Sequence, residues 1–289
     1  MTFKKLPPIF IGGLFKSGTS LLRAMLGQHS AIAAGLESYW FDLDWNGPRD
    51  KTFQAHIDRL QKFYGMDKAY VSTLIDQSKN ALNFLDRFLS AYATREGKKR
   101  WAEKTPGNIL YLDRIYNEFP NAKVIHIVRD PKDVLASHRQ ARKWDSVQVF
   151  VEMWCRFFGT NLKLQNELAP DPENYITIRY ESLIIDPVTT MRKVVNFLEE
   201  EWEDTIGHFS GKDDEYNKVL AITGKASTTL ERLSKPLTRD RIGIWRSILP
   251  EEEIIAVRDG VRKNGLLPLF MKIEEDTVVL LDKADQGKR

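Results

Sequence analysis

The chain has 289 residues, 42% of them hydrophobic, so it can bury a sizeable core, and we expect one domain over residues 1–289. Its 43 basic and 40 acidic side chains are interspersed, which argues against a nucleic-acid partner or a membrane surface. The single cysteine, Cys155, cannot form an internal disulfide and is typical of a reducing compartment. The N-terminal residues lack a signal-peptide pattern and no apolar run is long enough for a membrane span, so we expect a soluble, cytoplasmic protein.

The first informative stretch, residues 9–26, has the pattern of a buried strand, a glycine loop and a helix. The apolar run 9–11 is typical of an interior strand of a parallel sheet, and Gly18 lets the backbone turn tightly. Thr19 and Ser20 then open a helix, whose first N–H groups have no partner within the helix and favour an anion. The stretch therefore predicts a phosphate-binding loop.

This loop departs from the Walker A pattern of P-loop kinases and NTPases. The spacing from Gly13 to Gly18 fits, but Thr19 stands where the Walker lysine belongs, and the lysine comes earlier, at Lys16. A triphosphatase also needs a magnesium-binding carboxylate on a later strand, whereas the next buried strand ends at Arg129. An arginine at that place suits a second phosphate. A P-loop kinase or NTPase stays open as an alternative at this point.

Two charged residues follow further predicted strands. A short strand over residues 31–36 is followed by Glu37, and a strand over residues 101–105 carries Lys104 near its end. The carboxyl ends of parallel strands form the ligand-binding edge of an α/β sheet. Glu37 and Lys104 are therefore candidates for the site, although each residue type is more often a plain surface charge.

The remaining periodicity alternates between helix and strand. Strands are predicted over 123–128 and 175–180, and helical stripes fill 50–97, where they form core or an acceptor pocket. Further helices are predicted over 108–118, from Pro131 onward, and over 147–168, 188–198 and 251–263. Residues 200–236 are polar and irregular, as in a lid, the core ends near residue 265, and a charged tail from Asp282 is expected to be disordered. The pattern predicts an α/β fold of the P-loop-containing nucleotide-binding type, with a mostly parallel central sheet flanked by helices.

Two segments together resemble a known family. The segments 16–20, Lys-Ser-Gly-Thr-Ser, and 128–137, Val-Arg-Asp-Pro-Lys-Asp-Val-Leu-Ala-Ser, resemble the sulfotransferases that use 3′-phosphoadenosine 5′-phosphosulfate (PAPS). The resemblance covers about residues 8 to 250. It implies that the first segment holds the 5′-phosphosulfate and that Arg129 and Ser137 hold the 3′-phosphate. The residues implied in the first segment are Lys16, Ser17, Gly18, Thr19 and Ser20.

Other segments extend the resemblance. Glu103-Lys-Thr-Pro106 is similar to a family segment whose lysine, here Lys104, approaches the transferring group. Tyr180 opens a Tyr-Glu-x-Leu segment whose tyrosine reaches towards the cofactor phosphates. The family also has an Arg-x-Gly-x-Trp segment that closes over the 3′-phosphate. Its counterparts here are Arg241, Gly243 and Trp245, with Lys235 as a further phosphate contact.

The resemblance implies transfer of a sulfuryl group from PAPS to a hydroxyl or amine acceptor, with 3′-phosphoadenosine 5′-phosphate (PAP) as the product. Glu37 corresponds to the catalytic glutamate of carbohydrate and protein-tyrosine sulfotransferases and is the candidate base. Lys16 and Lys104 would neutralise the charge on the leaving oxygen, so no metal is required. The rival bases are His29, His126 and His138.

Two alternatives accompany this reading. One is the kinase or NTPase above. The other is a non-catalytic nucleotide-binding module, which the joint presence of Glu37 and Lys104 argues against. The expected acceptor is a small molecule, a carbohydrate or another hydroxyl-bearing compound. Protein-tyrosine sulfotransferases have a Glu-Glu-Thr-Arg type segment around their base, and the segment 36–40 here lacks the arginine, which argues against a peptide tyrosine.

Overall fold

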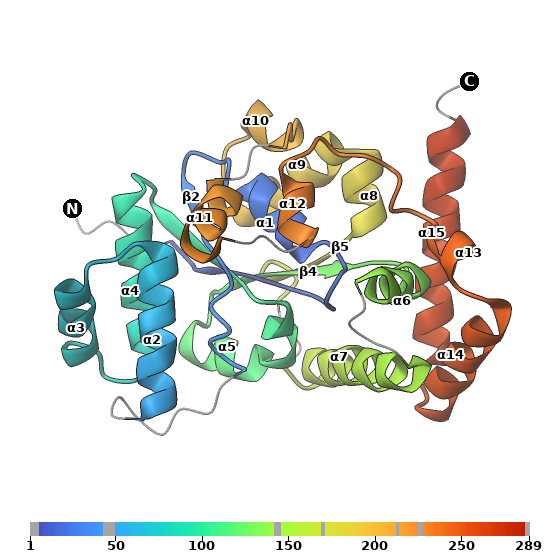
Figure 1. Ribbon diagram of the computed structural model, residues 1–289, viewed down its shortest axis with the longest axis horizontal. Helices are drawn as coiled ribbons and strands as arrows, with labels where there is room; N and C mark the ends of the chain where they lie inside the picture. The colour runs from blue at the N-terminus through green and yellow to red at the C-terminus, as the bar shows by residue number, and fades with distance from the viewer. Residues whose placement is uncertain are drawn as a thin grey trace.

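The computed structural model describes residues 6–42, 50–141, 146–168, 171–211, 214–224 and 228–286. Within these residues, five strands form one sheet in the order β2-β3-β1-β4-β5, and every pairing is parallel (Figure 1). The strands are β1 Ile9–Gly12, β2 Ile32–Ala34, β3 Arg100–Lys104, β4 Lys123–Val128 and β5 Tyr175–Arg179. The predicted α/β class with a parallel central sheet is confirmed.

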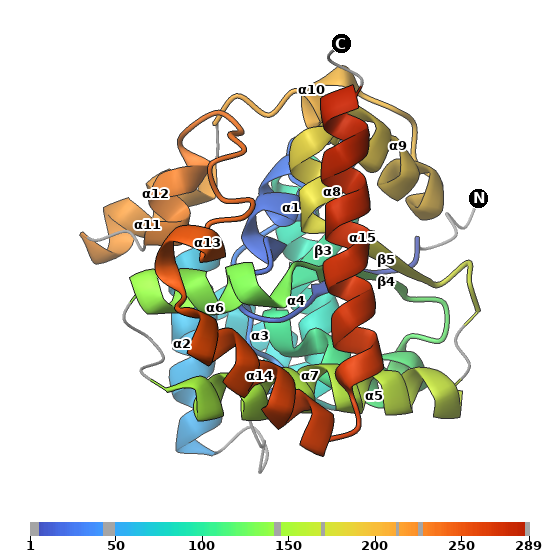
Figure 2. The ribbon, with the colours of Figure 1, turned by 90° about the vertical axis from the view of Figure 1, so that its right-hand side faces the viewer.

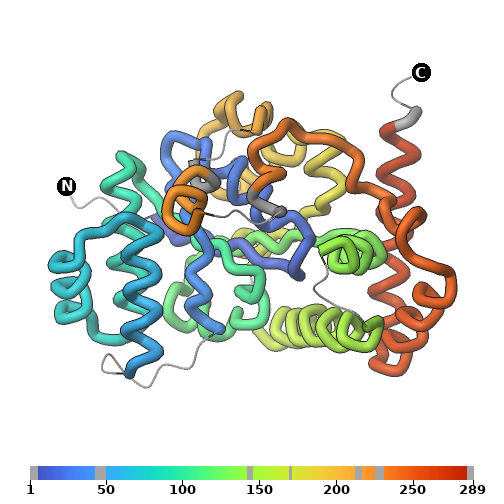
Figure 3. The backbone as a smooth tube through the Cα atoms, in the orientation of Figure 1, coloured from blue at the N-terminus to red at the C-terminus, as the bar shows by residue number. Residues whose placement is uncertain are grey.

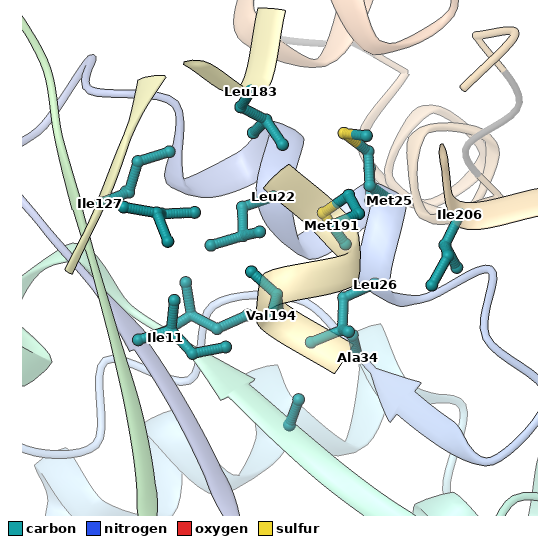
Figure 4. Close-up of a cluster of buried hydrophobic side chains, with 14 of the residues drawn as sticks. Ile11, Leu22, Met25, Leu26, Ala34, Ile127, Leu183, Met191, Val194 and Ile206 are labelled. Atoms are coloured by element: carbon teal, nitrogen blue, oxygen red, sulfur yellow. The ribbon is translucent and has the colours of Figure 1, made fainter. Parts of the chain in front are cut away.

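Helices cover both faces of the sheet because successive strand residues point to opposite sides. Ile9 and Ile11 face one layer of helices, while Phe10 faces the other. The first layer contains α1 Thr19–Leu26, α8 Tyr180–Ile185, α9 Pro187–Leu198 and α10 Asp204–Gly207. Figure 4 shows Ile11 and Ile127 of the sheet facing side chains of α1 and α9. The second layer contains α2 Lys51–Tyr64, α4 Ala81–Arg95 and α5 Leu112–Glu118, and α3 Lys68–Asp76 packs on α4.

A third cluster of helices packs with Val128 at the end of β4. It contains α6 Pro131–Gln140, α7 Val147–Leu168, α13 Trp245–Ile248, α14 Glu251–Lys263 and α15 Leu267–Gln286. Figure 2 shows α15 running along the side of the molecule. Phe270 and Ile273 of α15 are buried in the same cluster as Trp154. The expected end of the core near residue 265 was therefore too early, and the segment from Asp282 is helical as far as Gln286 rather than disordered.

Three other local predictions need correction. The helix expected over 108–118 is a 3-10 helix, η1 Pro106–Leu110, followed by α5, because the Asn108 amide is held by the Ile11 carbonyl and by Glu103. The short helix α8, which directly follows β5, was not anticipated. Residues 200–236 contain α10, α11 Asp214–Thr223 and α12 Thr228–Leu233 instead of an irregular loop. Helix α12 packs against α1 and α11 against α2 (Figure 3).

Candidate active site

The sheet aligns the predicted site residues in a row. Strand register places Ile11 of β1 beside Lys104 of β3, and Val128 of β4 beside Arg179 of β5. All five carboxyl ends therefore lie on one edge, and each strand contributes one predicted residue at or just after its end. In sheet order these residues are Glu37, Lys104, Lys16, Arg129 and Tyr180.

A cavity of about 810 Å³ opens at this edge. Its walls include eleven of the fourteen predicted site residues, namely Lys16, Gly18, Thr19, Ser20, Glu37, Lys104, Arg129, Ser137, Tyr180, Lys235 and Arg241. Ser17 is buried and, like Gly243 and Trp245, is not part of the wall. Residues 50–97, which were considered for an acceptor pocket, contribute Arg59 and Phe63 of α2 to the wall. Residues 200–236, which were considered for a lid, contribute Phe209 and Lys235.

The cavity wall is strongly basic. It carries only two acidic side chains among its described residues, Glu37 and Asp240. The basic side chains are Lys16, Arg23, Arg59, Lys104, Arg129, Arg232, Lys235 and Arg241. Like charges gathered around a concave, partly desolvated space favour a multiply charged anion.

The phosphate-binding loop is already folded. Gly18 caps α1 in the left-handed conformation, with φ of 98°, and a Cβ there would lie 2.5 Å from the Tyr180 ring. Lys16 has a positive φ of 68°, and its carbonyl accepts a hydrogen bond of 2.9 Å from Arg129. Helix α1 then begins at Thr19, so its first N–H groups face the loop without intrahelical partners. This is the geometry expected of an anion site.

At the β2–β3 end, Glu37 and Lys104 meet directly. The Lys104 ammonium pairs with one carboxylate oxygen of Glu37 and donates to the Ser20 hydroxyl at 3.1 Å. The Tyr39 hydroxyl donates to the other carboxylate oxygen. Arg59 of α2 donates to the Glu37 carbonyl at 2.7 Å and lies over the Tyr39 ring. We call Glu37 and Lys104 with these partners the transfer end of the cavity.

The surroundings shift the pKa of both members of this pair. Burial alone would raise the pKa of Glu37, but the charge and hydrogen bond of Lys104, the Tyr39 hydroxyl and the charge of Arg59 together lower it. Burial lowers the pKa of Lys104, and Glu37 opposes that change. The Glu37 carboxylate is therefore held ionised, as a base must be before it accepts a proton.

At the β4 end, two arginines converge on one hydroxyl. Arg129 donates to the Ser137 hydroxyl at 3.1 Å, and Arg241 donates to the same oxygen at 3.2 Å. The Arg129 guanidinium lies 4.6 Å from the centre of the Tyr180 ring. Burial is the main cause that lowers the pKa of Arg241, and the charges of Arg232 and Arg129 lower it further. We call Arg129, Ser137 and Arg241 the phosphate end.

Gly243 and Trp245 do not line the cavity, but both contact Asp133. Their backbone N–H groups donate to the two carboxylate oxygens of Asp133, at 2.8 and 3.1 Å. Asp133 is fully buried on α6, one turn from both Arg129 and Ser137. It thereby anchors the segment that carries Arg241.

The sequence prediction missed several contributors to this site. Arg23 and Arg59 line the cavity from helix positions that look like ordinary surface or core positions in the sequence. Tyr39, also missed, follows Glu37 by two residues, but only its positive φ of 55° turns it back onto that carboxylate. Asp133 lies inside the segment 128–137 that resembles the sulfotransferases, and its position there could have indicated a role in the site.

The three rival histidines differ in position. His126 is buried in β4 against the Tyr175 hydroxyl at 2.9 Å, and burial lowers its pKa to about 3. His29 contacts the Glu201 carbonyl and does not line the cavity. His138 does line the cavity, with Nε2 at 3.4 Å from the Phe15 carbonyl. Of the three, only His138 is placed where it could meet an acceptor.

Comparison with known proteins identifies the family. The model of the sulfotransferase family matches residues 7–204, more than half of the chain, so the chain belongs to that family. A protein-tyrosine sulfotransferase of Drosophila melanogaster is 24% identical over 279 residues, which cover 89% of this chain and 50% of the relative. The chain therefore spans half the length of this relative.

Solved structures confirm the fold. The sulfotransferase domain of the Synechococcus olefin synthase superposes with a TM-score of 0.63 at 20% identity, covering 88% of this chain and 94% of that domain. A mouse sulfotransferase, SULT7A1, complexed with PAP, superposes with a TM-score of 0.52 at 16% identity, covering 93% and 88% of the two chains. At these identities the likeness establishes the fold alone.

Two kinds of feature are absent from the described residues. No helix among them is long and apolar enough to cross a membrane. The same residues contain no group of three or more His, Cys, Asp or Glu side chains placed to hold a metal ion.

Proposed function

We propose that this chain transfers a sulfuryl group from PAPS to a hydroxyl acceptor. The observation that carries the proposal is that one cavity holds both a carboxylate–lysine pair and a separate two-arginine site, on either side of a phosphate-binding loop. PAPS needs both a 5′-phosphosulfate site and a 3′-phosphate site. The row Glu37, Lys104, Lys16, Arg129 follows that order of chemical groups along the sheet edge.

In the proposed reaction, the acceptor oxygen attacks the sulfur atom of PAPS. Glu37 takes the acceptor proton as the new oxygen–sulfur bond forms. The bond between sulfur and the bridging phosphate oxygen breaks, and PAP leaves with the electron pair. Lys16 and Lys104 neutralise the charge that grows on the leaving oxygen. Atoms and charge balance without a further reactant.

The cavity wall also bears on the acceptor. Its described residues include five apolar or aromatic side chains that the nucleotide phosphates do not require: Phe15, Leu36, Tyr39, Phe63 and Met153. Pockets that bind an organic ligand are lined mainly by such side chains, with a few polar groups that fix its orientation. We therefore favour a hydroxyl carried on an apolar or aromatic body. The Drosophila relative is named for a tyrosine acceptor, which is also a phenol.

The kinase alternative makes different predictions about ligands. Thr19 replaces the Walker lysine, and the strand that should bear a magnesium-binding carboxylate leads to Arg129. Calorimetry with PAP and with ATP, each with and without magnesium, separates the two functions. We expect PAP to bind more tightly than ATP, with no dependence on magnesium.

The decisive test is transfer itself. Purified protein is incubated with sulfur-labelled PAPS and three acceptor groups: simple phenols, aliphatic alcohols and monosaccharides, with and without EDTA. We expect labelled phenol or alcohol, and no loss of rate with EDTA. PAP binding without labelled product would favour a non-catalytic nucleotide-binding module, and an absolute magnesium requirement would favour the kinase.

A further inference from the structure

Glu103 is a fully buried carboxylate beside the transfer end, next in sequence to Lys104. One of its oxygens accepts hydrogen bonds from the Ser38 backbone N–H at 3.0 Å and from the hydroxyls of Ser38 and Thr105, both at 2.7 Å. The other oxygen accepts from the Asn108 amide at 2.5 Å. Burying a carboxylate costs free energy unless its oxygens accept hydrogen bonds. The four hydrogen bonds to Glu103 therefore fix the position of its side chain.

The segment after Glu37 is folded around this group. The Ser38 N–H donates to Glu103 itself, the Tyr39 N–H donates to the Thr105 hydroxyl at 3.0 Å, and the Trp40 N–H donates to the Ser38 hydroxyl at 3.2 Å. Both hydroxyls in turn donate to Glu103. The N–H groups of three consecutive residues, 38–40, are therefore tied to the carboxylate of Glu103, the first directly and the other two through one hydroxyl each.

Glu103 also connects this segment to the phosphate-binding loop. The Asn108 amide that donates to Glu103 donates as well to the Ile11 carbonyl, at 3.1 Å, at the end of β1. Lys104, the next residue along β3, pairs with Glu37. Glu103 thus contacts, directly or through one side chain, the three strand ends that carry Glu37, Lys104 and Lys16.

We infer that Glu103 is a positioning residue for sulfuryl transfer, which fixes the Glu37 carboxylate against Lys104 and the phosphate-binding loop. The inference rests on the proposed function, since it assigns Glu103 a role through Glu37. Misplacement of a reacting group by about 1 Å can cost on the order of 10²-fold in rate, so such a residue affects turnover without touching substrate.

The hydrogen bonds show why an amide cannot replace this carboxylate. The Ser38 N–H and the Asn108 amide are both obligate donors, and they meet different oxygens of Glu103. A glutamine offers one acceptor oxygen and one NH₂ group, so one of these donors would face another donor. Glu103→Gln therefore breaks the contacts on one side while keeping the size of the side chain.

The chain supplies a matched control in Glu181, a second fully buried glutamate. It accepts the Asp130 backbone N–H at 2.7 Å and pairs with Arg179 at 3.1 Å, so it supports the phosphate end instead. Both variants, Glu103→Gln and Glu181→Gln, replace one buried carboxyl group by an amide of the same size. Only the first disturbs the segment 38–40.

Three measurements compare the variants with the wild type: PAP affinity, hydrogen exchange of the backbone by segment, and turnover of labelled PAPS with a phenol acceptor. For Glu103→Gln we expect faster exchange over residues 38–40, a 10- to 100-fold loss of turnover, and a KM for PAPS within about threefold of wild type. For Glu181→Gln we expect weaker PAP binding, with exchange over residues 38–40 as in the wild type. Ser38→Ala, which removes only a hydroxyl, should give a smaller loss of the Glu103→Gln type and serves if Glu103→Gln fails to fold.

The outcomes separate this inference from the proposed function. Unchanged exchange over 38–40 in Glu103→Gln, or turnover within threefold of wild type, would overturn the role of Glu103 while sulfotransfer stands. Parallel losses of turnover and PAP affinity in both variants would also overturn it, because they would indicate general damage. A wild type that binds PAP but transfers no sulfuryl group would overturn the proposed function, and the role of Glu103 in transfer with it, whatever the exchange shows.

Discussion

The transfer end and the phosphate end of the cavity balance their charges in different ways. At the transfer end, Glu37 and Lys104 neutralise each other, Tyr39 donates to the Glu37 carboxylate, and Arg59 donates to the Glu37 backbone carbonyl. At the phosphate end, Arg129 and Arg241 meet at Ser137, and burial and neighbouring positive charge lower the pKa of Arg241. The transfer end has its counter-ion in direct contact. At the phosphate end, Asp133 lies 3.9 Å from Arg129 and already accepts two backbone N–H groups, so a bound anion would complete the charge balance there.

This difference suggests that one end contributes mainly to binding and the other mainly to catalysis. A bound 3′-phosphate would relieve the repulsion between the two arginines, so the phosphate end is suited to provide affinity. The transfer end gains little from ground-state binding, because Lys104 must share its charge between Glu37 and an incoming sulfuryl group. It is suited to stabilise the transition state. Variants at the two ends should therefore change different measured quantities.

The largest effect is expected from Glu37→Gln, which removes the base and keeps its size. Turnover should fall by about 10²–10⁴-fold, the range for a positioned general base, while PAP affinity stays within a few-fold. Initial rates and calorimetry on the same preparation measure both quantities. The control is Asp240→Asn, since Asp240 is the other acidic side chain among the described residues of the wall. Equal losses in the two variants would mean that only the local charge matters, and a dead His138 variant beside an active Glu37→Gln enzyme would move the base to His138.

The second prediction concerns affinity at the phosphate end. Arg129→Ala should weaken PAP binding by about 2–5 kcal/mol, the usual cost of breaking a desolvated charge pair. Adenosine 5′-phosphosulfate, which lacks the 3′-phosphate, should bind almost as it does to the wild type. Arg129→Lys keeps the charge but loses the planar fork, so it should give an intermediate loss. The same loss for both nucleotides would contradict the assignment of Arg129 to the 3′-phosphate.

A smaller change is expected when the support of the phosphate end is altered. In Asp133→Asn, the amide nitrogen cannot accept from Gly243 or Trp245, so one N–H loses its partner at a cost of about 1–3 kcal/mol. PAP affinity should fall by about tenfold, and turnover at saturating PAPS should persist. The matched control is Glu253→Gln on α14, which alters the partner of Arg139 on α6 but not the Arg241 segment. If Asp133→Asn left PAP affinity unchanged, the segment would not depend on this anchor.

At both ends the sequence predicts the central residues and misses some of their supports. Lys16, Arg129 and Ser137 lie within short segments that carry their own strand and helix signals, and the structure places all three on the cavity wall. Glu103 and Arg59 could not be found in this way, because each acts on a segment distant in the chain. The Ser38–Glu103 contact, for example, joins residues 65 positions apart. The roles given to these residues are still predictions.

The fold shows the same limit. The parallel sheet could be predicted because each buried strand is a local apolar run, and the boundaries of β4 and α7 matched their expected ranges. The helix α15 was missed because its exposed face and charged end look like a tail. What orders it is contact with distant elements, such as Lys132 with Glu274 at 2.7 Å.

The smallest effect is expected from Tyr39→Phe, which tests whether a neighbouring hydroxyl tunes the base Glu37. The Tyr39 hydroxyl is one of the groups that lower the pKa of Glu37 against the effect of burial, so Tyr39→Phe should raise that pKa. Glu37 accepts a proton only when ionised, so the rate falls as pH drops through its pKa, and in this variant the fall should begin at higher pH. The loss of one hydrogen bond, about 0.5–1.5 kcal/mol, also leaves the carboxylate less firmly positioned, and turnover at neutral pH should fall by about two- to tenfold. Initial rates of PAPS turnover measured from acid to neutral pH test this shift.

The neighbouring Tyr64 provides the control for that shift. Its hydroxyl donates to the Leu36 carbonyl at 2.5 Å, so Tyr64→Phe removes a hydrogen bond from the same segment without touching the carboxylate. It should lower thermal stability and leave the acid side of the pH profile in place. If both variants moved the profile equally, the segment as a whole would set the pKa of Glu37. If only Tyr39→Phe moved the profile, the hydrogen bond from the Tyr39 hydroxyl to the Glu37 carboxylate would be the cause. This direct contact would then help to keep Glu37 ionised.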